Sequence, residues 1–156
     1  MTSEHERLDA GLKTLGIAND RDVGTRLVAF LDLLEKWNRV YNLTAIRERE
    51  QMLTHHLLDS LAVVPHIRGP QVLDVGSGGG LPGIPVAIVR PEIEVTLLDS
   101  NHKKAAFLNQ AVAELRLTNV QVVAERVEAW ETSRRFATIV SRAFADLAAL
   151  VGLTER

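Results

Sequence analysis

The clearest chemical signal in the chain is a glycine-rich segment at residues 74–83, DVGSGGGLPG. It follows a strand-like apolar run and precedes a helical run, the context in which glycine loops bind nucleotides. Glycine permits sharp turns and close approach of a ligand to the main chain. Asp99 stands 23 positions after Gly76, at the end of the next strand-like run, where a carboxylate can accept hydrogen bonds from ribose hydroxyls. The spacing predicts a site for a nucleoside-containing ligand at Gly76, Gly78 and Asp99.

The residues around this loop narrow the class of ligand. A dinucleotide fingerprint requires a glycine where this chain has Leu81, and a P-loop requires a Gly-Lys-Ser/Thr sequence that does not follow here. We expect Pro82 and Pro85 in the first turn of the next helix, where each proline removes a backbone N–H that could bind phosphate. The loop therefore favours S-adenosylmethionine, which has no pyrophosphate, over NAD.

The glycine loop and Asp99 lie in a part of the chain where short β-rich runs alternate with helical stripes, and these elements must position them. We expect strands near residues 72–75, 95–99, 120–124 and 137–141, and a helical stripe over 105–115 that follows the N-cap candidates Ser100 and Asn101. Near-continuous apolar strands separated by helices are typical of a parallel sheet covered by helices. Residues 1–68 instead carry helical stripes over 27–41 and 53–64, with a break at 42–44. We predict an α/β fold, with a doubly wound, mainly parallel sheet over 69–156 and a helical N-terminal cap over 1–68, in one compact domain.

Composition excludes several classes of function. The chain has 156 residues, 46% of them hydrophobic, and no cysteine, so a disulfide framework, a Cys-ligated metal site and a cysteine nucleophile are excluded. We find no signal-peptide or membrane-length apolar run, and we expect a soluble, cytoplasmic protein without a membrane partner. The net charge of −2 means that any contact with nucleic acid must use a local basic patch.

Several segments resemble a known family. They are DVGSGGGLPGIP at 74–85, LLDSNHKKAAFL at 97–108, ERVE at 125–128, VSRAFA at 140–145, YNLTAIR at 41–47 and HLLDS at 56–60. Together they are similar to the RsmG family (glucose-inhibited division protein B), the bacterial 16S rRNA guanine-N7 methyltransferases. The resemblance implies a Rossmann-like class I methyltransferase fold, S-adenosyl-L-methionine as cofactor, and small-subunit ribosomal RNA as substrate. It also implies that Gly76, Leu81, Val127, Glu128 and Arg142 contact the cofactor, with Asp99 on its ribose.

The residues agree with methylation of guanine N7. Methylation of pyrimidine C5 normally requires a cysteine nucleophile, which this chain lacks. In the superfamily that the chain resembles, methylation of an exocyclic amine is associated with an Asn/Asp-Pro-Pro-aromatic loop after the fourth strand. This chain has Ser-Arg-Ala-Phe at that place, residues 141–144. Guanine N7 has an exposed lone pair, so methyl transfer needs in-line positioning and no general base. We expect Arg142 to be the catalytic residue, orienting the cofactor or the RNA or reaching guanine O6.

Other charged residues have two interpretations each. Lys103 and Lys104 are candidates for contacts with RNA phosphates, although a solvated helix face explains them equally well. Arg126 could contact RNA or pair with Glu128. His55, His56 and Asp59 have helical spacing, but adjacent histidines point to different faces, and we expect no metal site there.

The chain departs from the family in its extent. Family members continue for several strands beyond the fourth, and their fold resembles a seven-stranded sheet, whereas four strands are predicted here. We therefore expect an incomplete sheet whose fourth strand is an edge, and an unpaired edge is a template for self-association. The alternative to an active methyltransferase is a non-catalytic fragment of that fold that binds cofactor or RNA.

Overall fold

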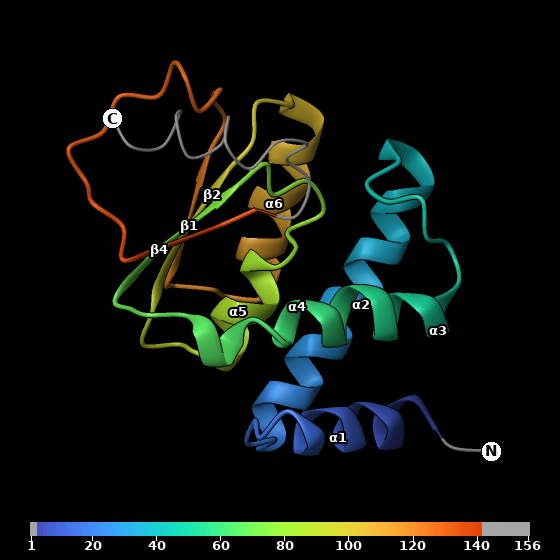
Figure 1. Ribbon diagram of the computed structural model, residues 1–156. Helices are drawn as coiled ribbons and strands as arrows, with labels where there is room; N and C mark the ends of the chain where they lie inside the picture. The colour runs from blue at the N-terminus through green and yellow to red at the C-terminus, as the bar shows by residue number, and fades with distance from the viewer. Residues whose placement is uncertain (1–2, 142–156) are drawn as a thin grey trace.

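A parallel sheet of four strands forms the centre of the protein, which we describe from a computed structural model (Figure 1). The structure describes residues 3–141, apart from the side chain of Arg21. The strands are β1 (Gln71–Val75), β2 (Glu94–Leu98), β3 (Val120–Val123) and β4 (Thr138–Val140), in the order β3-β2-β1-β4. In the register of the sheet, Val72 pairs with Val95 on one side and with Thr138 on the other. The predicted α/β class and parallel sheet are confirmed.

Two helices connect the first three strands. They are α5 (Gly83–Val89), between β1 and β2, and α6 (His102–Glu114), between β2 and β3. The Asn101 side chain caps α6 by accepting a hydrogen bond from the backbone N–H of Lys104 at 3.1 Å, as expected for an N-cap asparagine. Ala105, Phe107, Leu108 and Ala111 form the buried face of α6, because apolar residues at this spacing share one side of a helix.

The N-terminal part of the chain is helical. It comprises α1 (Glu4–Thr14), α2 (Arg21–Tyr41), α3 (Arg49–Gln51), the π-helix η1 (Met52–Leu58), α4 (Asp59–Leu61) and the short 3₁₀-helix η2 (Val64–His66). Asp20 caps α2 by accepting from the N–H groups of Asp22 and Val23. Asn42 ends α2 with a left-handed φ of 52°, which confirms the predicted break. The second predicted stripe is helical, but its first part is a π-helix rather than an α-helix.

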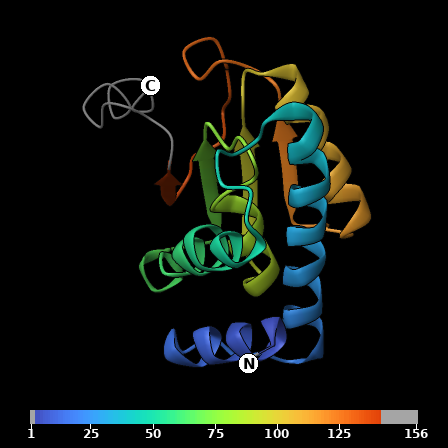
Figure 2. The ribbon, with the colours of Figure 1, turned by 90° about the vertical axis from the view of Figure 1, so that its right-hand side faces the viewer.

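Long helix α2 connects this cap to the sheet layer, and Figure 2 shows it standing beside the sheet. The ring of Trp37 on α2 lies 5.8 Å from that of Phe107 on α6. Leu31 and Leu34 from α2, Leu57 from η1 and Ile84 from α5 belong to one cluster of buried apolar residues. The cap therefore packs directly on the helices that follow β1 and β2.

The opposite face of the sheet carries a second apolar cluster. Leu73, Val75 and Leu98 are its buried members, and Trp130 and Phe136 pack against them. Within residues 3–141, no helix is both long and apolar enough to cross a membrane.

Candidate functional site

The glycine-rich loop turns sharply at the carboxyl end of β1. Gly76, Gly78 and Gly80 have positive φ values of 70°, 55° and 83°, a region that glycine enters without steric cost. The N–H groups of Gly76 and Ser77 donate to the carbonyl of Leu98 at 2.8 and 3.2 Å, so the loop begins against the end of β2. A Cβ built on Gly76 would have no described atom within 4 Å outside its own chain neighbours. The main chain at Gly76 is thus open to a ligand.

Asp99 lies directly after β2 and faces this loop. Its Oδ2 atom accepts from the N–H of Gly78 at 2.8 Å, and its Oδ1 atom accepts from the N–H of Asn101 at 2.8 Å. Only 8% of the residue is exposed. A carboxylate has about four acceptor positions, so both oxygens can still accept from a ligand hydroxyl. The structure brings together the predicted acid and the predicted loop, and it adds a bond between them that the spacing did not indicate.

Sequence reasoning missed a second carboxylate, Asp74, which anchors the far end of the loop. Its Oδ2 atom accepts from the N–H of Gly83 at 2.9 Å. A Cβ on Gly83 would lie 2.3 Å from Leu97 Cδ2 and 2.6 Å from Asp74 Oδ2, so a residue with a side chain does not fit. The signal for this contact was the glycine inside the LPGIP extension, nine positions after the aspartate.

Asp74 is completely buried, and its Oδ1 atom has no hydrogen-bond partner among the described residues. Burial raises the pKa of this carboxyl well above its ordinary value, and the nearby charge of Asp99 adds to the increase. The hydrogen bonds from Gly83 and Ser77 act in the opposite direction but are weaker. The two aspartates at this edge of the sheet therefore have different environments, one enclosed and one facing the loop.

The start of α5 has few backbone donors to offer a phosphate. The N–H groups of Gly83, Ile84 and Val86 bond to oxygens inside the protein, and Pro85 has no N–H. Pro82 is the N-cap residue of α5 rather than part of its first turn, which corrects the sequence-based placement. Since pyrophosphate binding uses free N–H groups at a helix start, this geometry supports a ligand without pyrophosphate.

Strand order places the loop at a switch point of the sheet. β1 pairs with β2 on one side and with β4 on the other, and ligands of open α/β sheets bind at the carboxyl ends of strands beside such a point. The hydroxyl of Ser141, directly after β4, donates to the carbonyl of Val75 at 2.9 Å. Ser141 therefore lies beside the start of the glycine loop. Arg142, the predicted catalytic residue, lies outside the described residues.

The other predicted cofactor residues lie in different surroundings. The side chain of Leu81 is part of the main core, and the residue is 6% exposed, so only its main chain could meet a ligand. Val127 is half-buried and packs on the second cluster, whereas Glu128 is exposed. The guanidinium of Arg126 lies 3.9 Å from the carboxylate of Glu128. A pair so exposed contributes little to stability, and it leaves the Arg126 side chain accessible.

The predicted RNA-binding lysines lie at the start of α6. Lys103 is exposed and Lys104 is half-buried, on the helix whose N-cap follows Asp99 by two residues. They are therefore close in the chain to the proposed ribose acid. Of the residues considered for a metal, His56 is buried and its Nε2 atom lies 2.6 Å from the hydroxyl of Thr44, while His55 and Asp59 are exposed.

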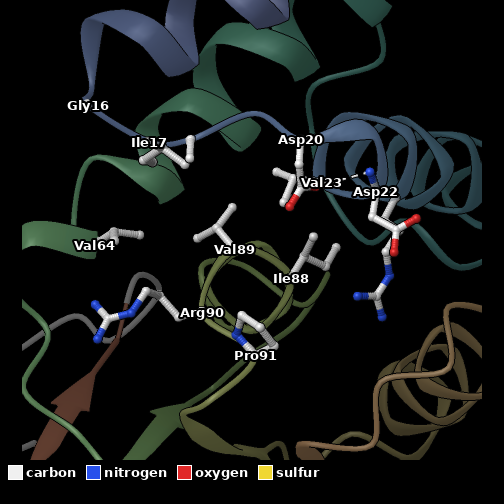
Figure 3. Close-up of a pocket in the computed structure, with 12 residues that line it drawn as sticks. Gly16, Ile17, Asp20, Asp22, Val23, Val64, Ile88, Val89, Arg90 and Pro91 are labelled. Carbon is white, nitrogen blue, oxygen red and sulfur yellow. Dashed lines mark hydrogen bonds between the residues drawn. The ribbon is translucent and has the colours of Figure 1, made fainter.

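A cleft of about 370 Å³ lies elsewhere, between the α1–α2 connection and the end of α5 (Figure 3). Ile17, Val23, Ile88 and Val89 form apolar walls, with Arg90 and Pro91 at the end of α5. Glu94 starts β2 just beyond these residues, so the cleft lies toward the amino ends of the strands. Since α5 begins at the glycine loop and ends at this cleft, the cleft is separate from the predicted cofactor site.

Comparison with known families gives a match over most of the chain. Residues 24–156 match the GidB family, described as rRNA small subunit methyltransferase G. The chain belongs to the GidB family. The resemblance inferred from the motifs is confirmed, and the family membership covers both the glycine loop and most of the helical cap.

Individual relatives in the GidB family are closely similar. The Ribosomal RNA small subunit methyltransferase G of Laribacter hongkongensis is 58% identical over 150 residues, which cover 96% of this chain and 72% of that protein. The protein of the same name from Nitrosospira multiformis is 56% identical over 147 residues, covering 94% and 68%. These relatives are longer than this chain.

A solved structure supports the fold assignment. The O-methyltransferase TomG from Streptomyces achromogenes, determined in complex with SAM, superposes with a TM-score of 0.50 and 16% sequence identity. The match covers 90% of this chain and 63% of TomG. The GidB chain thus has the Rossmann-like fold of class I methyltransferases, with a four-stranded sheet in its described part.

Proposed function

We propose that this chain is an S-adenosyl-L-methionine-dependent methyltransferase that methylates N7 of a guanine in small-subunit (16S) ribosomal RNA. The observation that carries the proposal is the bond between Asp99 and Gly78, which places a carboxylate beside an open glycine loop. Membership of the rRNA small subunit methyltransferase G family supports the same function. The cellular location that follows is the cytoplasm, where ribosomal RNA is modified.

The residues of the loop fit this cofactor. Asp99, held by the N–H of Gly78, offers acceptors for the two ribose hydroxyls, and the open main chain at Gly76 accommodates the methionine end. We assign further contacts to the Leu81 main chain and, beyond β3, to Val127 and Glu128. When bound, the cofactor supplies an electrophilic methyl group on its sulfonium sulfur.

Methylation of guanine N7 requires orientation rather than proton removal. N7 would attack the methyl donor with its lone pair and carries no proton, so the chain would need no base to remove one. The protein must hold the base edge in line with the methyl donor. We assign Arg142 to this orientation, because its chain neighbour Ser141 bonds to the carbonyl of Val75, at the start of the loop. Arg142 could also contact the cofactor.

RNA contacts are assigned to Lys103, Lys104 and Arg126. The first two lie on the helix that follows Asp99, and Arg126 is exposed just after β3. Positive side chains at these positions would hold phosphates around the base to be methylated. We also propose that residues 1–68 and 69–156 are the cap and the cofactor-binding region of one compact domain.

Two measurements test the function. Calorimetric titration with S-adenosylmethionine, with NADH as control, should give saturable one-site binding of the former alone. Transfer of labelled methyl groups to small ribosomal subunits that lack the modification should then label the RNA. The Arg142→Ala variant should lose methyl transfer to RNA while it stays folded, with a melting temperature close to that of the original chain. A variant that unfolds would instead indicate a structural role.

A second candidate is a cofactor- or RNA-binding module without turnover. The Asp99–Gly78 bond and the open main chain at Gly76 concern cofactor binding rather than methyl transfer, so they fit this candidate as well. Binding of S-adenosylmethionine without any label on the RNA would support this candidate over the enzyme.

We further propose self-association through β4. This strand is at an edge of the sheet in the described part of the chain, and Ile139 is 39% exposed. Exposed edge strands pair with other chains. Sedimentation should show a concentration-dependent dimer that the substitution Ile139→Lys weakens, and a monomer at all concentrations would refute this proposal.

A further inference from the structure

The glycine loop packs against the helical cap at Gly79. A Cβ built on Gly79 would lie 3.1 Å from Leu34 Cδ1, on α2, and 3.8 Å from both the Cβ and the carbonyl oxygen of Leu43. Leu34 is fully buried and Leu43 is 8% exposed. The middle of the loop therefore rests on Leu34, in the second half of α2, and on Leu43, in the segment 42–46 that follows the helix.

This following segment has no regular secondary structure, and its shape is held by hydrogen bonds around Thr44. The N–H of Thr44 donates to Asn38 Oδ1 at 2.8 Å, and the N–H of Ile46 donates to the Thr44 hydroxyl oxygen at 3.1 Å. The same hydroxyl lies 2.6 Å from His56 Nε2. One residue thus connects the three parts: its N–H bonds to Asn38 on α2, and its hydroxyl bonds to Ile46 in the following segment and lies beside His56 on η1.

Both side chains that bond to Thr44 are buried. Asn38 is 2% exposed and His56 is 6% exposed, so their positions are fixed by the packing around them. Polar side chains in such surroundings are costly unless they are paired, and they hold their partners in one geometry when they are. Asn38 on α2 and His56 on η1 therefore hold Thr44, which adjoins Leu43 in the chain.

We infer that Asn38, Thr44 and His56 are positioning residues for the cofactor loop: they hold Leu43 against Gly79 and so keep the loop in its ligand-ready shape. This inference rests on the proposed function, since it assumes that the glycine loop binds S-adenosylmethionine. None of the three residues needs to touch the cofactor. Their effect passes through the contact at Gly79, because a binding loop is only as well placed as the groups that support it.

The test uses the full chain with two substitutions of Thr44. Thr44→Val removes the hydroxyl and keeps the branched shape, whereas Thr44→Ser keeps the hydroxyl. Thr54→Val is the matched control. Thr54 lies on η1, the π-helix that carries His56, and among the described contacts its hydroxyl bonds only to the carbonyl of Glu50. We expect Thr44→Val to weaken S-adenosylmethionine binding by about tenfold at a temperature far below melting, with the serine and control variants within about twofold of the original chain.

A second readout does not depend on the ligand. The N–H groups of Gly78, Gly80 and Leu81 are hydrogen-bonded in the loop, so their hydrogen exchange reports its order. In Thr44→Val they should exchange faster, while the N–H groups of Glu94 and Val95, at the other end of the sheet, should be unchanged. Should Thr44→Val fail to fold, His56→Leu replaces it, with His56→Gln as the variant that restores a hydrogen-bonding group.

The two readouts separate the two ideas. Failure of the original chain to bind S-adenosylmethionine, together with faster loop exchange in Thr44→Val, would refute the proposed function and leave the support role intact. Unchanged binding and unchanged loop exchange in a folded Thr44→Val would overturn the positioning inference. A lowered melting temperature without either change would show that the network stabilises the cap only, and would overturn it as well.

Discussion

The Oδ2 atom of Asp99 accepts a hydrogen bond of 2.8 Å from the backbone N–H of Gly78. At the carboxyl end of β2 this carboxylate holds the glycine loop in place, and in the proposed function its remaining lone pairs accept hydrogen bonds from a ribose. The same bond explains why Asp99 is almost buried, since the loop folds over it. A ligand that contacts Asp99 necessarily lies against the loop.

Replacement of Asp99 by alanine should weaken S-adenosylmethionine binding by about 1–3 kcal/mol, the range for hydrogen bonds to a charged group. The matched control is Glu94→Ala, at the exposed amino end of the same strand, which should leave the affinity unchanged. Calorimetric titration measures both. Equal affinities for Asp99→Ala and the original chain would remove the ribose assignment.

Alanine substitutions at two glycines with similar backbone conformations can distinguish the effect of backbone strain on stability from the effect of a ligand contact on binding. Gly76 and Gly16 have φ values of 70° and 72°, and a Cβ on either would meet no described atom within 4 Å beyond its chain neighbours. Replacement by alanine should cost each about 1–2 kcal/mol of the free energy of unfolding. Only Gly76→Ala should also weaken cofactor binding, by about tenfold or more, because Gly16 lies at the end of α1. If both variants bind equally well, the ligand does not approach Gly76.

Gly83→Ala should destabilise the fold through overpacking. The new methyl group would lie 2.3 Å from Leu97 Cδ2 and 2.6 Å from Asp74 Oδ2, and both neighbours are buried. We expect a loss of about 1–3 kcal/mol in urea denaturation. Gly69→Ala is the control, since its Cβ would make only an ordinary contact of 3.4 Å with Ile93. A fully stable Gly83→Ala would show that the loop has room to move at this point.

The buried carboxyl of Asp74 should make stability depend on pH. Its pKa is raised in the folded state, mainly by burial, so the folded protein binds its proton more tightly than the unfolded chain does. The free energy of unfolding should therefore fall as pH rises above the unfolded value of about 3.9, until the folded pKa is passed. In Asp74→Asn this contribution disappears, and the variant should gain relative to the original chain across the same interval. Parallel curves of unfolding free energy against pH would contradict the raised pKa.

Much of the architecture was predictable because it depends on local patterns. The strands at 72–75 and 95–99 are apolar runs that emerge as the two central strands, and the stripe from Leu27 to Tyr41 lies within α2. The Asn101 cap, the break after Tyr41 and the glycine loop follow from the preferences of single residues. The π-helix at Met52–Leu58 was not predictable, because the apolar spacing there also fits an α-helix.

The sequence alone determined the parallel α/β class, the glycine loop after β1, the acid after β2 and, through the motifs, the family. These depend on residue type and on spacing along the chain. The tertiary structure decided how the loop is held: Asp99 on Gly78, Asp74 on Gly83, and Leu43 behind Gly79. These contacts join residues 9, 21 and 36 positions apart, and no local preference encodes them. The first two arise because folding brings buried carboxylates within hydrogen-bond distance of main chain that glycine leaves uncovered, and the third arises because the cap packs on the loop where glycine has no side chain.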